Sequence, residues 1–150
     1  MIQRKQTLLL LMAVILGVMT LSMPIASVTG DGLSFSRIYN LLRMDMHGQV
    51  YYDVWPLFLL LLLPSAISMY TIFQYKRRML QAALCLISML LYVVWYIALI
   101  VYSKMLAPDA LGFQLTWVAA LPAVCALLNL MARKAIIADE KLVRAADRIR

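Results

Sequence analysis

Four long apolar segments with no internal charge limit what this chain can fold into. They cover residues 7–28, 54–75, 79–103 and 114–132. About 20 apolar residues in a helix are enough to cross the hydrocarbon core of a bilayer. The chain is 65% hydrophobic and 14% charged, whereas soluble domains are about 45–50% apolar. We therefore predict an all-α membrane protein with four transmembrane helices, in which residues 1–150 form a single polytopic domain.

The positions of lysine and arginine predict how the four helices are oriented. Three basic residues fall in the two connections on one side, namely Arg37, Arg43 and Lys104. The other eleven fall on the opposite side: Arg4, Lys5, Lys76, Arg77, Arg78, Arg133, Lys134, Lys141, Arg144, Arg148 and Arg150. Cytoplasmic loops carry an excess of such residues. We therefore expect both termini, and the short turn at residues 75–79, to lie in the cytoplasm.

Residues 29–53 form the one sizeable external loop. A short helix at the membrane interface over residues 35–46 and a small pair of strands are both compatible with its pattern. His47 is the only histidine, and Asp45 and Asp53 are close to it in the sequence. A lone loop histidine without a second imidazole or a cysteine is more typical of a solvated turn than of a metal or proton site. We expect no metal here.

The four apolar segments contain none of the usual chemistry of membrane enzymes and coupled transporters. Ionisable residues inside a span commonly mark ion paths and proton relays, and these segments have no Asp, Glu, Lys, Arg or His. There is also no pair of carboxylates and no serine accompanied by a histidine base. We expect a non-enzymatic protein with no catalytic residues and no cofactor.

Neutral polar residues nevertheless recur at helical spacing within two of the segments. Gln81, Cys85, Ser88 and Tyr92 share a face of the third. Cys125 and Asn129 share a face of the fourth. Such side chains join helices by hydrogen bonds worth about 0.6 kcal/mol each, and this is the interpretation we favour. The alternative is a groove that holds a small molecule or a lipid.

The tail, residues 133–150, is predicted to form an amphipathic cytoplasmic helix with apolar residues on one side and charges on the other. It could lie on the membrane surface, or present its apolar stripe to a protein partner or a second copy. Interspersed acidic residues and missing aromatic residues argue against nucleic acid. The residues expected to make cytoplasmic contacts are Lys76, Arg77, Arg78, Lys141, Arg144 and Arg148.

Three stretches of this chain resemble a known family along nearly the whole length. They are MIQRKQTLLLL at the start, WPLF…IFQYKRRMLQAALC in the centre and LLNLMARKAIIADEKLVRAADRIR at the end. The resemblance is to an uncharacterised bacterial four-span family, the domain of unknown function 4293. It implies a multi-pass protein of the bacterial inner membrane, and it implies no activity.

The sequence thus favours a non-enzymatic accessory or assembly component of a bacterial inner-membrane complex. The charged, patterned tail suggests contact with a partner, and the apolar segments suggest no chemistry. The alternative is a small carrier or lipid-handling protein that acts as a homo-oligomer through a neutral groove of the third and fourth helices.

Overall fold

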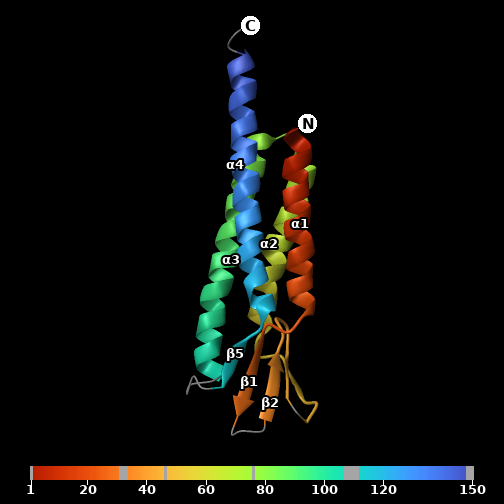
Figure 1. The fold of residues 1–150 in the computed structure, drawn as a ribbon, viewed down its shortest axis with the longest axis vertical. Helices are drawn as coiled ribbons and strands as arrows, with labels where there is room; N and C mark the ends of the chain where they lie inside the picture. The colour runs from red at the N-terminus through yellow and green to blue at the C-terminus, as the bar shows by residue number, and fades with distance from the viewer. Residues whose placement is uncertain (1, 31–33, 46, 76, 107–111, 148–150) are drawn as a thin grey trace.

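Four helices, each long and apolar enough to cross a membrane, run side by side along the length of the molecule (Figure 1). The computed structural model describes residues 2–30, 34–45, 47–75, 77–106 and 112–147. The helices are α1 (Ile2–Ser22), α2 (Trp55–Phe73), α3 (Arg78–Leu106) and α4 (Leu121–Asp147), and a 3₁₀ turn, η1 (Trp117–Ala120), precedes α4. The predicted set of four apolar helices is confirmed.

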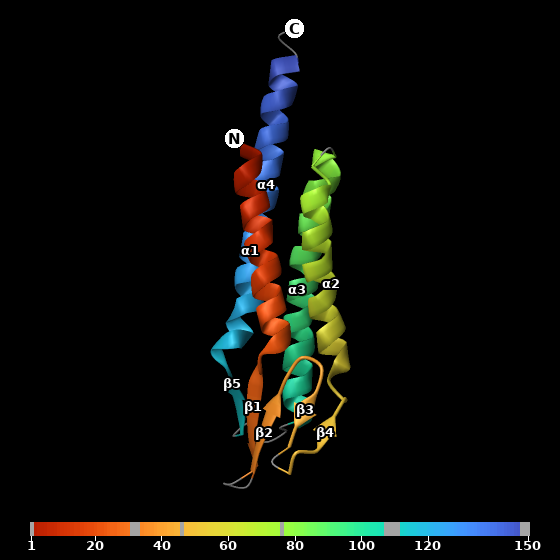
Figure 2. The same ribbon diagram turned by 90° about the vertical axis from the view of Figure 1, so that its right-hand side faces the viewer.

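The helices form a bundle in which each one packs against two neighbours. α4 packs against α1 and α3, and α2 packs against the same two helices from the other side. Helices that follow one another along the chain run in opposite directions (Figure 2). As a result α1 and α4 carry the chain termini to the same end, where α4 extends well beyond the other helices (Figure 1).

A small antiparallel sheet closes the opposite end of the bundle, so the all-α prediction is wrong in this respect. Its strands, in the order β4-β3-β2-β1-β5, all pair antiparallel with their neighbours. They are β1 (Ala26–Gly30), β2 (Ser34–Ile38), β3 (Arg43–Met44), β4 (Val50–Tyr51) and β5 (Phe113–Leu115). The interfacial helix considered for residues 35–46 is also wrong, because this loop forms strands.

Two ends of the predicted spans belong to this sheet. The first span was expected to reach residue 28, but α1 ends at Ser22. Pro24 explains the difference, because a proline disfavours helical geometry in the residue before it and cannot continue the hydrogen-bond ladder. The fourth span was expected to begin at residue 114, but β5 pairs Leu115 with Ala26 and Phe113 with Val28.

The other helices differ from the predicted segments at their ends. α2 lies inside the predicted 54–75, and α3 runs past the predicted 79–103 at both ends. α4 continues without a break from the bundle into the tail as far as Asp147. The amphipathic tail is therefore the end of the fourth helix and not a separate element.

The sheet is fixed to the bundle by a shared core. Ile25 and Ile38 at the sheet end are fully buried against Leu57, Leu61 and Trp95 of the helices. A second buried cluster lies toward the termini and includes Leu10, Cys85, Ala132 and Ile136. Between the helices of a membrane protein, stability comes chiefly from close packing and from hydrogen bonds. The polar groups inside the bundle therefore matter for its architecture.

Candidate functional site

A series of buried polar side chains runs through the interior of the bundle, and we call it the polar column. Its members, all at most 5% exposed, are Gln6, Thr20, Asn40, Ser65, Ser68, Thr71, Gln81, Cys85, Ser88, Tyr92, Cys125 and Asn129. All four helices contribute, and Asn40 comes from the loop between β2 and β3. The six inter-helix or groove residues named from the sequence are all members.

Hydrogen bonds of the polar column join different helices. The Ser68 hydroxyl donates to Oδ1 of Asn129 at 3.1 Å, which connects α2 to α4 across the bundle. Nδ2 of Asn129 donates in turn to the carbonyl of Cys125 at 2.9 Å. Nε2 of Gln81 donates to the carbonyl of Thr71 at 3.2 Å and connects α3 to α2.

The Cys125 thiol makes a further link, from α4 to α1. Its Sγ donates to the carbonyl of Ala13 at 3.4 Å. One turn along α1, Gly17 faces α2 so closely that a Cβ there would collide with the Ser65 hydroxyl oxygen. A glycine at this position lets the two backbones approach, as small residues commonly do between membrane helices.

Three polar atoms of the column have no hydrogen-bond partner among the described residues. They are Nε2 of Gln6, Oγ of Ser88 and Oη of Tyr92. Gln6 lies on α1, and Ser88 and Tyr92 lie one turn apart on α3. The bonded members hold the helices in register. The polar column cannot supply a carboxylate or imidazole acid–base pair, because it contains no Asp, Glu or His.

The loop residue Asn40 completes the column at the sheet end. Its Nδ2 donates to the carbonyl of Thr20 at 2.8 Å, within the last turn of α1, where backbone carbonyls lack helical partners. Its Oδ1 accepts a hydrogen bond from Nε1 of Trp95 at 3.0 Å. All three residues are fully buried. Asn40 therefore fastens the β2–β3 loop between α1 and α3.

Basic residues gather at the end of the bundle where the chain termini lie. Nη1 of Arg78 forms an ion pair with Oδ2 of Asp139 at 2.9 Å, and the two side chains are 26% and 14% exposed. Arg77 and Lys141 are exposed nearby along the chain. Of the predicted cytoplasmic contacts, Lys76 and Arg148 lie outside the described residues, as does the side chain of Arg144.

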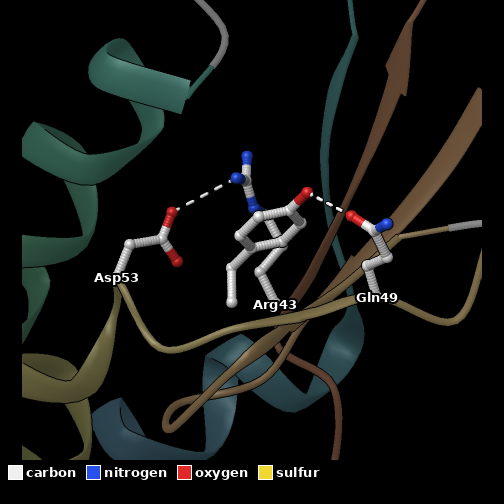
Figure 3. A network of polar contacts seen from close by, with 4 residues as sticks. Arg43, Gln49 and Asp53 are labelled. Atoms are coloured by element: carbon white, nitrogen blue, oxygen red, sulfur yellow. Dashed lines mark hydrogen bonds and ion pairs between the residues drawn. The ribbon is translucent and has the colours of Figure 1, made fainter.

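A second polar network lies on the sheet, at the opposite end (Figure 3). Arg43 forms an ion pair with Asp53 at 3.3 Å, and its guanidinium carbon lies 5.0 Å from the ring centre of Tyr51. The Tyr51 hydroxyl donates to Oε1 of Gln49 at 2.7 Å. This network connects the β3–β4 hairpin to the start of α2. Its exposed ion pair is worth at most about 1 kcal/mol.

His47 lies on the surface of the sheet end. It is exposed in the turn between β3 and β4, and Asp53 pairs with Arg43 instead. Across the described residues, no group of three His, Cys, Asp or Glu side chains has an arrangement that would hold a metal ion.

Among the described residues, the surface includes two hollows that no residue of the polar column lines. One, of about 480 Å³, opens beside the sheet end of α3 and has an almost wholly apolar wall. Its wall includes Leu99, Ile100, Phe113, Leu115 and Ala119. The other, of about 510 Å³, lies at the opposite end between α4 and the α2–α3 turn. None of the six inter-helix or groove residues named from the sequence lines either hollow.

A comparison with family models matches residues 2–149 to the family described as Domain of unknown function (DUF4293). The chain belongs to this family. A comparison with curated proteins gave no match. Membership in DUF4293 thus assigns no specific function. A proposal for the function of this chain therefore depends on the arrangement of its residues.

Several column residues of this DUF4293 chain were missed from the sequence. Ser65, Ser68 and Thr71 recur at a spacing of three on α2, so helical periodicity was an available signal. Asn40 had only an indirect signal. The indole N–H of a buried tryptophan usually finds a partner, and Trp95 inside an apolar span has none on its own helix.

Proposed function

We propose that this chain is a non-enzymatic accessory or assembly component of a bacterial inner-membrane complex, with both termini in the cytoplasm. Four apolar helices support the membrane location, since each is long enough to cross a bilayer. Their outward surfaces expose large apolar side chains, among them Leu11, Leu63, Val94 and Leu127. Without lipid to cover it, this much exposed apolar surface is unusual for a soluble protein.

The orientation rests on the charge distribution along the fold. Eleven of the fourteen basic residues occur in segments at the end of the bundle that carries the termini, or adjoin it in sequence. Arg37, Arg43 and Lys104 belong to segments at the sheet end. By the positive-inside rule, this pattern supports the proposal that the termini lie in the cytoplasm and the sheet lies outside. Exposed Trp55 and Trp117 at the sheet end fit an interfacial aromatic belt.

One observation supports the accessory role most directly: α4 projects beyond the rest of the bundle (Figure 1). The ion pair between Arg78 and Asp139 joins α4 to the start of α3. Beyond it, Leu142 is 61% exposed and Val143 is 39% exposed. Apolar side chains on a projecting, otherwise charged helix are typical of helix-in-groove recognition or of self-association.

The partner would be a protein or a second copy of this chain. Tail residues available for such a contact include Leu142 and Val143, with Lys141 beside them on the same helix. Nucleic acid is disfavoured as a partner, because acidic residues alternate with basic ones along this part of α4. No catalytic residue and no cofactor is proposed.

Purification of the tagged full-length chain from its native membrane in mild detergent tests this role. A companion, or a second copy, should be recovered at a fixed ratio. Leu142→Ser should lower that ratio about tenfold, as expected when a buried apolar anchor worth about 1.4 kcal/mol is lost. Leu127→Ser is the control, because Leu127 is equally exposed on α4 but lies within the span. A monomeric wild-type chain with no companion would contradict the proposal.

The orientation has its own test. Cysteines introduced at Ala145 and at Gln114, both exposed, report opposite ends of the bundle. On intact cells a membrane-impermeant maleimide should label the cysteine at position 114 and spare the one at 145. Labelling at 145 before lysis would overturn the proposed orientation.

A second candidate, a small carrier or lipid-handling protein that acts as a homo-oligomer, is favoured by the apolar hollow beside the sheet end of α3. Its volume of about 480 Å³ lies within the range of ligand pockets, about 300–1,000 Å³. Ala120→Trp would fill it. If this candidate is right, Ala120→Trp should remove the lipid bound in this hollow and leave the partner ratio of the chain unchanged.

A further inference from the structure

The hollow at the end of the bundle that carries the termini has both charged and apolar residues in its wall. It lies between the α2–α3 turn and the projecting part of α4, and its volume is about 510 Å³. Its lining residues are Arg77, Arg78, Met79, Leu80, Glu140 and Val143. Met79 and Leu80 are exposed apolar side chains that directly follow the two arginines. An occupant must therefore be charged at one end and apolar at the other.

The position of the hollow along the chain fits the boundary between hydrocarbon and water. Arg78 begins α3 and Arg77 directly precedes it, and the 25 residues after Arg78 contain no charge until Lys104. Charged side chains at the end of an apolar span lie at the level of the lipid headgroups. Met79 and Leu80 would then face the first part of the acyl chains. This holds for either orientation of the protein.

Arg77 is the cation of the lining that one phosphodiester can pair with. The charged residues of the wall are Arg77, Arg78 and Glu140, and a phosphodiester carries a single negative charge. Arg78 already pairs with Asp139, whereas none of the ion pairs found among the described residues uses Arg77. The Arg77 guanidinium is exposed, and guanidinium binds phosphate oxygens through two parallel hydrogen bonds.

We infer that this hollow binds a phospholipid, with the phosphodiester on Arg77 and an acyl chain along Met79 and Leu80. The inference goes beyond the accessory role, because it names a lipid and not a protein as the occupant of this site. The two surfaces share Val143, which lines the hollow, whereas Leu142, the residue that tests the partner contact, does not.

Native mass spectrometry of the full-length chain, released from detergent with added phosphatidylglycerol or phosphatidylethanolamine, tests the site. Wild type should retain one lipid of either kind. Arg77→Gln should lower the fraction of protein that retains lipid about tenfold. Arg77→Lys should retain a fraction between those of wild type and Arg77→Gln, because lysine keeps the charge and loses the paired hydrogen bonds of guanidinium. Lys134→Gln is the control, since Lys134 is exposed on α4 but does not line the hollow. Equal retention by Arg77→Gln and wild type would overturn the inference.

A second set of measurements separates a bound lipid from a bound free anion. Inorganic phosphate should not displace the lipid, and Met79→Asn should weaken retention while leaving Arg77 in place. Displacement by inorganic phosphate, together with no effect of Met79→Asn, would overturn the lipid assignment. The thermal midpoint of each variant shows whether it is folded. Since Arg77 and Met79 are both exposed, we expect both variants to unfold within about 2 °C of wild type.

Discussion

The indole Nε1 of Trp95 donates a hydrogen bond to Oδ1 of Asn40, at 3.0 Å and across 55 positions of sequence. Nδ2 of the same asparagine donates to the carbonyl of Thr20 at 2.8 Å. The Asn40 side chain thus provides hydrogen-bond partners for a backbone carbonyl at the end of α1 and for the indole of a buried tryptophan. The β2–β3 loop and the bundle are therefore expected to fold as one cooperative unit.

Asn40→Ala should destabilise the protein by about 1–3 kcal/mol, because two buried groups, Nε1 of Trp95 and the carbonyl of Thr20, lose their partner. The thermal midpoint in detergent measures this. Gln49→Ala removes a polar contact from the exposed part of the sheet and should change the midpoint little. If Asn40→Ala behaved like Gln49→Ala, the proposed fastening role would be wrong.

Gly17→Leu should separate α1 from α2, because a side chain at position 17 would collide with Ser65. We expect a loss of about 1–3 kcal/mol, typical of an overpacked core. Val18→Leu adds volume at the next residue, where the side chain is exposed to the surroundings, and should be nearly neutral. Unfolding in a titration with sodium dodecyl sulfate compares the two variants.

A double-mutant cycle on Ser68→Ala and Asn129→Leu should give a coupling free energy near 0.6 kcal/mol, the average for such bonds between membrane helices. The side chains are joined at 3.1 Å between α2 and α4. Asn129→Leu alone should cost more than Ser68→Ala, since it also removes the hydrogen bond to the carbonyl of Cys125. Strictly additive effects would show that the bond contributes nothing.

Exchanging the two charges of the Arg78–Asp139 pair tests how α4 is held at the α2–α3 turn. Arg78→Asp alone places two acidic groups together and should lower the thermal midpoint. The double variant Arg78→Asp/Asp139→Arg should recover most of that loss, because the ion pair is partly buried. Lys134→Asp, with no ion pair among those found in the described residues, controls for the change in net charge. No recovery in the double variant would argue against the pair.

Cys85 and Cys125 should resist N-ethylmaleimide in the folded protein and react after denaturation. Both thiols are free and fully buried, so the reagent has no access until the helices separate. Mass spectrometry before and after addition of sodium dodecyl sulfate counts the modified thiols. Gln114→Cys supplies an exposed thiol that should react at once. Modification of Cys85 or Cys125 at a comparable rate would mean that the interior is open.

The helices were predictable from the sequence because each carries its own pattern. Length and apolar content identify a span without reference to the rest of the chain. The face formed by Gln81, Cys85, Ser88 and Tyr92 was visible for a similar reason, since helical periodicity is local. These predictions needed no knowledge of which segments meet.

The sheet was not predictable in this way. β5 pairs with β1 across a separation of almost ninety residues, and strands of two to five residues carry too little periodicity to identify. Asn40 shows the same limit for a single residue. Its role depends on Thr20 and Trp95, which come from helices before and after it in the chain.

The unbroken course of α4 has a mechanical consequence. Its 27 residues make a rod of about 40 Å at 1.5 Å per residue, and η1 and β5 adjoin its lower end. The helix is unbroken from Leu121 to Asp147. If the proposed companion binds at Leu142, a pull or tilt would act along the helix axis on η1, which joins α4 to the strand at the far end of the bundle.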